Sequence, residues 1–340
     1  MSALQLRTHN YSRADYAVEN TLNKAVDSRY TISLDQIMHY ESLWDAKYKR
    51  HHVLAERDGE TVAMAGYAEW PWWYEPGRYV FYIGVDPNYR RQGIGGQLYN
   101  YLLEKLAKAE PKGRLLMVKC WEDASDSMRF LKQRGFQQTG GDYSSLLDVA
   151  SFDNSRFADL VERVRQQGIQ IINYAEMVRR IPDYQRRCYE MHWDSFQDVP
   201  AGGERTQPTF EHYIKQTFEN PDFVAETYFV ALDGGQLVGE SNLFPDHANP
   251  EQMITQYTGV IRSHRRRGIA RALKVRVIDS AKTWGIKTIV AGNDFRNPMY
   301  ELNLQLGFQP QPGELFFEKK IEGDFDKLVG YACTSTDRKD

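Results

Sequence analysis

One pattern occurs twice in this sequence, and no other feature constrains the fold as strongly. The segment YIGVDPNYRRQGIGGQL at 82–98 aligns without a gap with YTGVIRSHRRRGIARAL at 257–273. The opening tyrosine, glycine and valine of each copy are identical, as are two arginines and the glycine and isoleucine after them. Self-similarity at a fixed offset indicates two copies of one structural unit. The 340 residues of the chain have room for two domains of ordinary size.

The same order of predicted elements surrounds both copies. Upstream, residues 53–70 and 228–244 each have the pattern of two strands joined by a glycine-containing turn. Downstream, the apolar spacing becomes helical, and a short strand (114–121 or 288–292) precedes a helix that ends in Gly-Phe. Each half is therefore predicted as an α/β (α+β) unit with a mixed sheet flanked by helices.

We place the domain boundary near residue 150. Residues 1–150 form the predicted N-terminal domain and residues 151–340 the predicted C-terminal domain. Residues 151–167 have the apolar pattern of a linker helix, and a polar tail is expected after residue 322.

The repeated turn has the composition of an anion-binding site. A strand is predicted to end near Val85 or Val260, and a helix is predicted to begin near Gly93 or Gly268. Glycine allows close backbone approach to a ligand, and a helix start adds partial positive charge beside the arginines. A diphosphate would accept hydrogen bonds from the backbone N–H groups and would balance the positive charge of the helix start and the arginines. Neither copy has the Lys-Ser or Lys-Thr of a P-loop, and neither completes the three-glycine dinucleotide pattern.

Composition excludes several other classes of protein. The formal charge of -3 and the pI near 6.3 argue against a nucleic-acid partner. The sequence has no signal-peptide pattern and no apolar run of about 18 residues, so we expect a cytoplasmic protein without a membrane partner. Three widely spaced cysteines and scattered histidines match no zinc motif, so no metal is expected.

With these residues in view, the sequence resembles the GNAT superfamily of N-acetyltransferases. Both copies fit the pattern R-x-x-G-x-[GA], which in that family forms the pyrophosphate loop for acetyl-CoA, and both lead into strand, helix and Gly-Phe. The arrangement is similar to tandem acetyltransferases of the mycothiol synthase kind. The resemblance implies two tandem acyl-CoA N-acyltransferase (GNAT) domains, each with a mixed, mostly antiparallel sheet. It also implies direct transfer of an acetyl group from acetyl-CoA to a primary amine of a small molecule or peptide.

The resemblance also indicates which residues contact coenzyme A. In the first half these are Val85, Arg90, Arg91, Gln92, Gly93, Ile94, Gly95 and Gly96. In the second half they are Val260, Ile261, Arg265, Arg266, Arg267, Gly268, Ile269, Ala270, Arg271, Asn293 and Asn297. A strand bulge is expected to free the N–H of Val85 or Val260 for the thioester carbonyl.

The catalytic residues are less clear, because the tyrosine and glutamate common in the family are missing from their usual positions. Candidates are Tyr300 as a proton donor, Asn303 as a holder of water, and Glu240 as a base. Helix packing explains Tyr300 equally well, and a surface position explains Glu240. We expect the second half to be catalytic and the protein to be a monomer or homodimer. The alternative is a non-catalytic coenzyme A binding sensor or scaffold, which the missing residues keep open.

Overall fold

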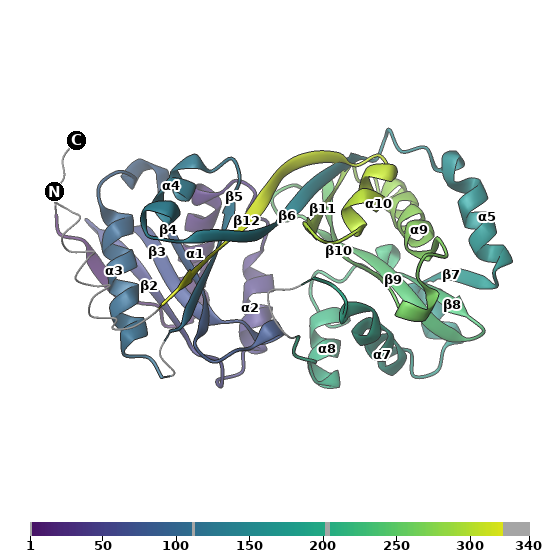
Figure 1. The fold of residues 1–340 in the computed structure, drawn as a ribbon, viewed down its shortest axis with the longest axis horizontal. Coiled ribbons are helices and arrows are strands. Elements are labelled where there is room, and N and C mark those ends of the chain that lie inside the picture. Colours follow the sequence, from purple (N-terminus) through teal and green to yellow (C-terminus); the bar gives the residue numbers. More distant parts are fainter. Residues whose placement is uncertain (1, 111–112, 201–204, 322–340) are drawn as a thin grey trace. The chain divides into compact units, whose positions relative to one another are not determined.

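The computed structural model describes residues 2–110, 113–200 and 205–321. The polar tail predicted after residue 322 lies outside them. The chain divides into two compact units (Figure 1). Unit 1 contains residues 1–140 together with the segment from Leu315, and unit 2 contains residues 141–314. The division predicted from sequence was contiguous, whereas the second part of the last strand, from Leu315, is here grouped with unit 1.

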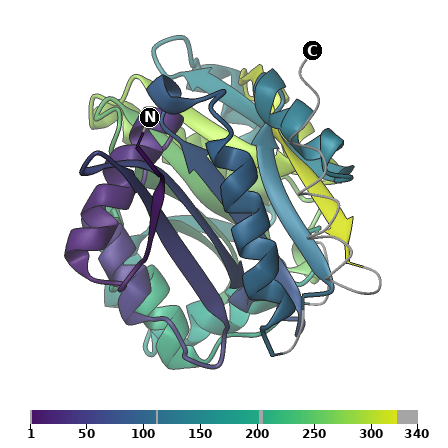
Figure 2. The same ribbon diagram turned by 90° about the vertical axis from the view of Figure 1, so that its left-hand side faces the viewer.

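Unit 1 follows the predicted order of strand, helix, hairpin, strand, turn and helix. Its elements are β1 (Gln5–Thr8), α1 (Arg13–Val26), α2 (Leu34–Ser42), β2 (Arg50–Arg57), β3 (Glu60–Glu69), β4 (Arg78–Val85), α3 (Ile94–Ala107), β5 (Leu115–Trp121) and α4 (Ser125–Gln133). The hydroxyls of Ser12 and Ser33 cap α1 and α2 by accepting from backbone N–H groups of the first turn. Helices α1 and α3 both pack on β3 and β4, on opposite faces of these strands (Figure 2).

Unit 2 repeats this order with additional helices. The linker helix appears as α5 (Ala158–Gln166), which precedes β7 (Ile169–Asn173). The remaining elements are α6 (Tyr174–Arg180), α7 (Tyr184–Phe196), α8 (Phe210–Thr217), β8 (Phe229–Asp233), β9 (Gln236–Pro245), β10 (Gln252–Val260), α9 (Ile269–Thr283), β11 (Thr288–Asp294) and α10 (Met299–Gln305). Helices α7 and α9 both contact β9 and β10.

Two strands are divided between the units: β6 (Gln137–Asp148) begins in unit 1 and ends in unit 2, and β12 (Gln309–Lys320) runs the other way. Strand order is β1-β2-β3-β4-β5-β12 in unit 1 and β6-β11-β10-β9-β8-β7 in unit 2. Most neighbours are antiparallel, and the pairs β4–β5 and β10–β11 are parallel. The mixed, mostly antiparallel sheet predicted for each half is confirmed.

The two strands of each parallel pair are hydrogen-bonded over only a few residues and then separate. Strands β4 and β5 pair from Arg78 to Val80, and β10 and β11 pair from Gln252 to Ile254. Beyond these positions, the described strands show no further pairing with each other. The later part of β4 and of β10 therefore has an edge with free backbone groups directly before the repeated turn.

Candidate functional site

The two repeated turns have the same backbone conformation. Arg91 has a φ of 61° and Gly93 a φ of 80°, and the matching values are 64° at Arg266 and 87° at Gly268. The glycines are the N-cap residues of α3 and α9. Because a left-handed φ is easily adopted only by glycine, the backbone itself requires these two residues. A Cβ at Gly268 would also lie 2.8 Å from Cδ1 of Leu160 on α5.

Backbone N–H groups at the start of both helices have no protein acceptor. In α9 the first intrahelical bond runs from the N–H of Ala272 to the carbonyl of Gly268, at 3.0 Å. Within the described ranges, no acceptor is found for the N–H groups of Ile269, Ala270 and Arg271, nor for those of Ile94, Gly95 and Gly96 in α3. The two isoleucine side chains are buried, so only their backbone is available. Such helix starts attract anions.

The first arginine of each motif stabilises the turn by a hydrogen bond to the end of the preceding strand. Nε of Arg90 donates to the carbonyl of Val85 at 3.1 Å, and Nε of Arg265 donates to the carbonyl of Val260 at 2.9 Å. Arg265 also donates to a carboxylate oxygen of Asp198 at 2.6 Å. Arg262 and Arg265 hold the pKa of Asp198 below its usual value through these hydrogen bonds. The charge of Arg265 is therefore already paired.

The other arginines of the second turn differ in availability. Arg267 lies 3.3 Å from a carboxylate oxygen of Asp233, and Arg271 donates to Gln305. Arg266 is exposed, and no carboxylate pairs with it in the part of the chain that the structure describes. Arg266 is therefore the cation of this turn that can meet a ligand.

The first turn is the more exposed of the two. Arg91, Gln92 and Gly93 are exposed, whereas Arg267 and Gly268 are partly buried. Arg91 lies 4.0 Å from a carboxylate on α4, and Gln92 accepts from Arg57 at 2.6 Å. A Cβ on Gly95 would lie 3.3 Å from the ring of Phe130. The guanidinium of Arg134 stacks on that ring at 3.5 Å and lies 3.4 Å from the Cβ position of Gly96.

In unit 2, the edge of β10 presents an unpaired N–H at Val260. The N–H of the next residue, Ile261, donates to the carbonyl of Val238 on β9, at 3.0 Å. Because successive residues of a strand direct their N–H groups to opposite edges, that of Val260 faces the opening between β10 and β11. The bulge lies between Thr255 and Tyr257, earlier than expected, and the pairing of β3 with β4 contains none.

Two of the predicted asparagines meet beside this opening. Nδ2 of Asn303, on α10, donates to Oδ1 of Asn293, on β11, at 2.8 Å. Asn303 is fully buried, and its own Oδ1 has no hydrogen-bond partner among the described residues. Asn297 is used differently, since its Oδ1 accepts from the N–H of Met299 at the start of α10. The orphaned Oδ1 of Asn303 is therefore a buried acceptor, and a ligand in the opening does not reach it in this conformation.

Glu240 is a buried residue and not a surface one. It is 2% exposed on β9, and Oε1 lies 2.6 Å from Nδ1 of His192 on α7. Oε2 accepts from the hydroxyl of Tyr228. With Glu240 as acceptor, Nδ1 carries the imidazole proton and Nε2 keeps its lone pair. His192 retains 22% side-chain exposure, so this pair has the geometry of a general base and the group that orients it.

A tyrosine of the repeat completes this cluster. The ring centre of Tyr257, on β10, lies 4.7 Å from that of His192, and its hydroxyl is 3.0 Å from Oγ of Ser195. A Cβ on Gly259 would lie 2.4 Å from the Tyr257 hydroxyl, so that glycine makes room for it. Burial raises the pKa of Tyr257, which keeps its phenol protonated at neutral pH.

Tyr300 lies elsewhere, in an aromatic stack. Its ring is stacked on that of Tyr143 with centres 4.3 Å apart, and Tyr143 also contacts Phe295. His192, Tyr228 and Tyr257 were not predicted as site residues. Only Tyr257 left a signal in the sequence, as the partner of Tyr82 in the repeat.

The buried carboxylate opposite the repeat glycine occurs in unit 2 and is replaced in unit 1. Gly259 pairs across the ladder with Glu240, whereas the matching glycine of the first repeat, Gly84, pairs with Met64. Unit 1 therefore has an apolar thioether in the position of the buried carboxylate.

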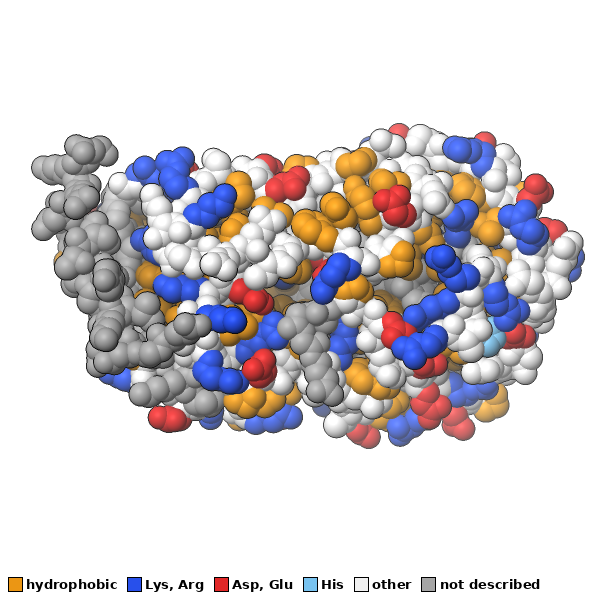
Figure 3. Space-filling view, in the orientation of Figure 1, with side chains coloured by type: hydrophobic (Ala, Val, Ile, Leu, Met, Phe, Trp, Pro, Cys, Tyr) orange, Lys and Arg blue, Asp and Glu red, His pale blue; other side chains and the backbone are white. Residues whose placement is uncertain are grey.

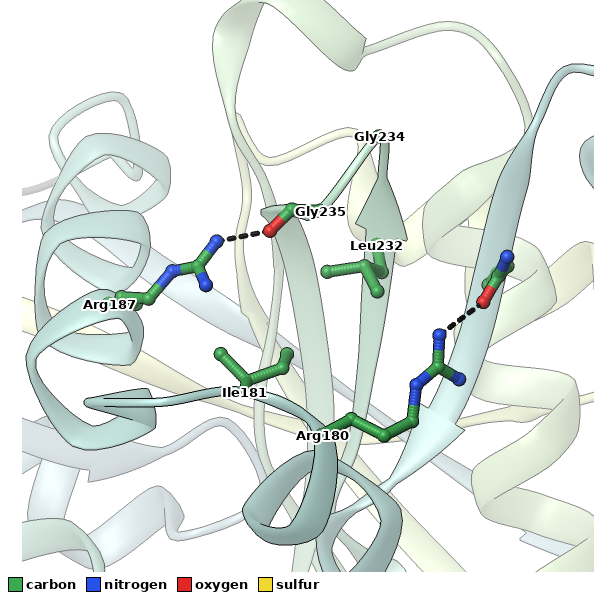
Figure 4. A pocket seen from close by; sticks show the side chains of 7 residues that line it. Arg180, Ile181, Arg187, Leu232, Gly234 and Gly235 are labelled. Carbon is green, nitrogen blue, oxygen red and sulfur yellow. Dashed lines mark hydrogen bonds between the residues drawn. The ribbon is translucent and has the colours of Figure 1, made fainter.

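A separate hollow of about 250 Å³ lies in unit 2 where the β8–β9 turn meets α6 and α7 (Figure 4). Arg187 donates to the carbonyl of Gly235, and Arg180 donates to Gln170 and Glu176. Both guanidinium groups are thus engaged, and no nucleophile or base lines this hollow.

On the face drawn in Figure 3, Lys and Arg side chains are interspersed with Asp and Glu and form no broad basic surface. Among the described helices, none has the length and apolar character needed to span a membrane.

Comparison with known proteins identifies this architecture. The model of the acetyltransferase (GNAT) family matches twice, at residues 18–136 and 185–308. A search of curated proteins found no significant match. Among solved structures, a tandem GNAT protein from the clavulanic acid biosynthesis pathway is 17% identical, with a TM-score of 0.70 over 95% of this chain and 100% of that one. A GCN5-related N-acetyltransferase from Sphaerobacter thermophilus is also 17% identical, with a TM-score of 0.66 over 93% and 95% of the two chains.

Proposed function

The chain belongs to the GNAT acetyltransferase family, and from this premise we propose that it transfers an acetyl group from acetyl-CoA directly to a primary amine. We assign the transfer to unit 2 and the acceptor to a small molecule or a peptide. The observation that carries this proposal is the buried Glu240–His192 pair, 2.6 Å apart, beside the second repeated turn. A protein that only binds coenzyme A has no use for such a pair, which therefore favours the enzyme over the sensor or scaffold.

The residues present fit acetyl-CoA. The free N–H groups of Ile269, Ala270 and Arg271, together with the Arg266 guanidinium, would hold the diphosphate. The open edge of β10 would hold the amide groups of the pantetheine arm. Bound acetyl-CoA supplies the acetyl group as a thioester.

Each step of the transfer then has a named residue in this unit. Nε2 of His192 takes the proton that the attacking amine must lose, while Glu240 stabilises the imidazolium that forms. The N–H of Val260 donates to the acetyl carbonyl oxygen as its negative charge develops. The N–C bond forms and the C–S bond breaks. The proton that His192 accepted passes to the departing thiolate, and the Tyr257 hydroxyl beside the imidazole donates a hydrogen bond to the sulfur, so both side chains return to their starting protonation state.

An assay of thiol release from acetyl-CoA across a panel of small amines and peptides tests this function. We expect release that depends on the amine, with transfer of the acetyl group to it confirmed by mass spectrometry. Tight binding of acetyl-CoA without amine-dependent release would establish the sensor instead.

A further inference from the structure

Three residues that are distant in the sequence converge in unit 1, beside Tyr82 at the start of the first repeated segment. They are His9, directly after β1, Glu19 on α1, and His52 on β2. Nε2 of His9 lies 3.4 Å from Oε2 of Glu19, and Nδ1 of His52 lies 3.6 Å from the same oxygen. All three atoms lie within 4.8 Å of one another. Over the described part of the chain, no other set of three or more histidine, cysteine, aspartate or glutamate side chains brings its ligand atoms this close together.

The three atoms are buried and lack hydrogen-bond partners. The side chain of His9 is 0% exposed, that of Glu19 is 11% exposed, and that of His52 is 15% exposed. Separations of 3.4 and 3.6 Å exceed the usual N–H···O range of about 2.7 to 3.2 Å. An unsatisfied buried polar group costs roughly 1–3 kcal/mol, so three at one point indicate that something else satisfies them.

We propose that His9, Glu19 and His52 bind a divalent transition-metal ion, and that Zn²⁺ fits the site best. Two imidazoles and a carboxylate are a common zinc ligand set, with a water molecule in the fourth position. A tetrahedral Zn²⁺ with bonds of about 2.0–2.1 Å separates its ligand atoms by about 3.3–3.4 Å. Two of the three separations between the ligand atoms, 3.4 and 3.6 Å, are close to this value. Mg²⁺ and Ca²⁺ are disfavoured, because they prefer sites made of oxygen atoms alone.

The surroundings of Glu19 leave one oxygen for the metal. Oε1 accepts a hydrogen bond from the hydroxyl of Tyr82 at 3.1 Å, and Oε2 is the orphaned atom that faces both histidines. An outer hydrogen bond of this kind fixes the orientation of a ligating carboxylate. Rings of Tyr11, Tyr16 and Tyr82 pack around the two imidazoles and limit access of water.

His9 must change tautomer when the metal binds, and the backbone beside it allows that change. The N–H of Tyr11 donates to Nδ1 of His9 at 2.9 Å, so a neutral His9 carries its proton on Nε2. Metal binding at Nε2 moves the proton to Nδ1, which then needs an acceptor. Tyr11 has a φ of 60°, in the left-handed region. Metal binding would therefore require a flip of the peptide between Asn10 and Tyr11, which would take this φ to roughly −120°, an allowed value, and would turn the Asn10 carbonyl toward Nδ1.

The metal would join β1, α1 and β2 and would thereby stabilise unit 1. Three protein ligands and one water are the ligand set of an open zinc site, not of a closed one with four protein ligands. An ion that binds only the folded chain stabilises it, and the effect grows with the logarithm of its concentration. The proposal is independent of acetyl transfer, because it involves none of the residues assigned to catalysis in unit 2.

The test is Zn²⁺ binding to the full-length chain after treatment with a chelator, followed by competition with a chromogenic zinc indicator. We expect one Zn²⁺ per chain and a rise in melting temperature with added Zn²⁺. Glu19→Gln and His52→Gln should weaken binding by more than the roughly 10- to 100-fold that loss of an outer hydrogen bond causes. His51→Gln is the matched control, since His51 is the neighbour on β2 but contacts Tyr101 at 3.2 Å. It should bind Zn²⁺ like the wild type.

Absence of stoichiometric Zn²⁺ binding to the wild-type chain would overturn the proposal, as would equal affinity in Glu19→Gln and His51→Gln. If the ligand variants fail to fold, Tyr82→Phe keeps all three ligands and should bind about 10- to 100-fold more weakly. Unchanged affinity in Tyr82→Phe would count against the site as described. Absorption of Co²⁺ substituted for Zn²⁺ gives a separate readout, because four-coordinate Co²⁺ has intense visible bands and six-coordinate Co²⁺ has weak ones.

Discussion

Nδ1 of His192 lies 2.6 Å from Oε1 of Glu240, on a helix and a strand that are separated by 48 positions in the sequence. This contact joins α7 to β9 at the end of β10 that precedes the repeated turn. If the pair is the general base, Glu240→Gln removes the charge that orients and supports the imidazole. We expect kcat to fall by about 100- to 10,000-fold, with little change in the dissociation constant of acetyl-CoA.

The control for this substitution is Glu190→Gln, since Glu190 lies on the same helix as His192 but is exposed. Steady-state thiol release and equilibrium binding of acetyl-CoA should be measured on both variants. A Glu240→Gln variant with wild-type kcat would remove the pair from the mechanism.

Gly268→Ala should impair acetyl-CoA binding. The alanine must adopt a φ of 87°, at a cost of about 1–2 kcal/mol, and its Cβ meets Leu160. Gly285 has a φ of 74° with no atom within 4 Å of its Cβ position, so Gly285→Ala carries similar backbone strain far from the turn. We expect at least about a tenfold weaker affinity in Gly268→Ala alone, a difference of about 1.4 kcal/mol. Equal affinities in the two variants would contradict the proposed diphosphate site.

Substitutions in the two turns also test which unit is active. Gly93→Ala places the same strain in the first turn, where φ is 80°. We expect Gly93→Ala to keep wild-type turnover and Gly268→Ala to lower it by at least about fivefold, measured at one acetyl-CoA concentration near the KM of the wild type. Equal losses in both variants would refute the assignment of catalysis to unit 2.

Tyr257→Phe and Tyr300→Phe separate two candidate donors to the departing thiolate. Tyr257 contacts the His192 ring, whereas Tyr300 is stacked on Tyr143. We expect Tyr257→Phe to lower kcat by about 100-fold or more and Tyr300→Phe to change it less than about threefold. Single-turnover rates of thiol release are the appropriate measurement, because they do not depend on how fast the products leave the enzyme. The reverse order of effects would restore Tyr300 as the donor.

Lys274→Met should stabilise the protein at neutral pH. Lys274 is 3% exposed on α9, and burial lowers its pKa from 10.5 to about 7. Between these values the unfolded chain binds more protons than the folded one, so wild-type stability rises with pH by up to about 1.4 kcal/mol per unit. The loss of stability that comes from burying this lysine is complete below pH 7 and vanishes above pH 10.5.

Urea unfolding at pH 7 and pH 9 measures this effect. The Met variant should show a smaller rise in stability between the two pH values than the wild type. Lys287→Met, at a 68% exposed side chain, is the control and should keep the wild-type slope. A Lys274→Met variant with an unchanged slope would show that this lysine is not buried in its neutral form.

The parts of the fold that follow local pattern could be predicted from the sequence. The two turns, the helices after them and the Gly-Phe ends are set by glycine, arginine and apolar spacing along short segments. The division of β6 and β12 between the two units could not be predicted. Each strand follows a helix that ends in Gly-Phe, and nothing in the local sequence indicates which neighbouring strand it pairs with. His192 was missed for a similar reason, since a lone histidine on a helix gains its role only through Glu240 on β9.

For two predicted site residues, the structure adds contacts that the sequence does not indicate. Arg265 stays a predicted phosphate contact, and the structure adds two partners for it, the carbonyl of Val260 and the carboxylate of Asp198. Glu240 was open to a surface interpretation, and its 2% exposure shows that it is buried. In both cases the residue type was informative, while its partners depended on packing between distant segments.

The crystal structure of this protein with bound acetyl-CoA is the most direct test of the central claim. We predict the diphosphate against the N–H groups of Ile269 to Arg271, the pantetheine arm along the free edge of β10, and the thioester beside His192 and the N–H of Val260. Acetyl-CoA bound only at the turn of unit 1, or bound in unit 2 with its thioester remote from the Glu240–His192 pair, would contradict the account.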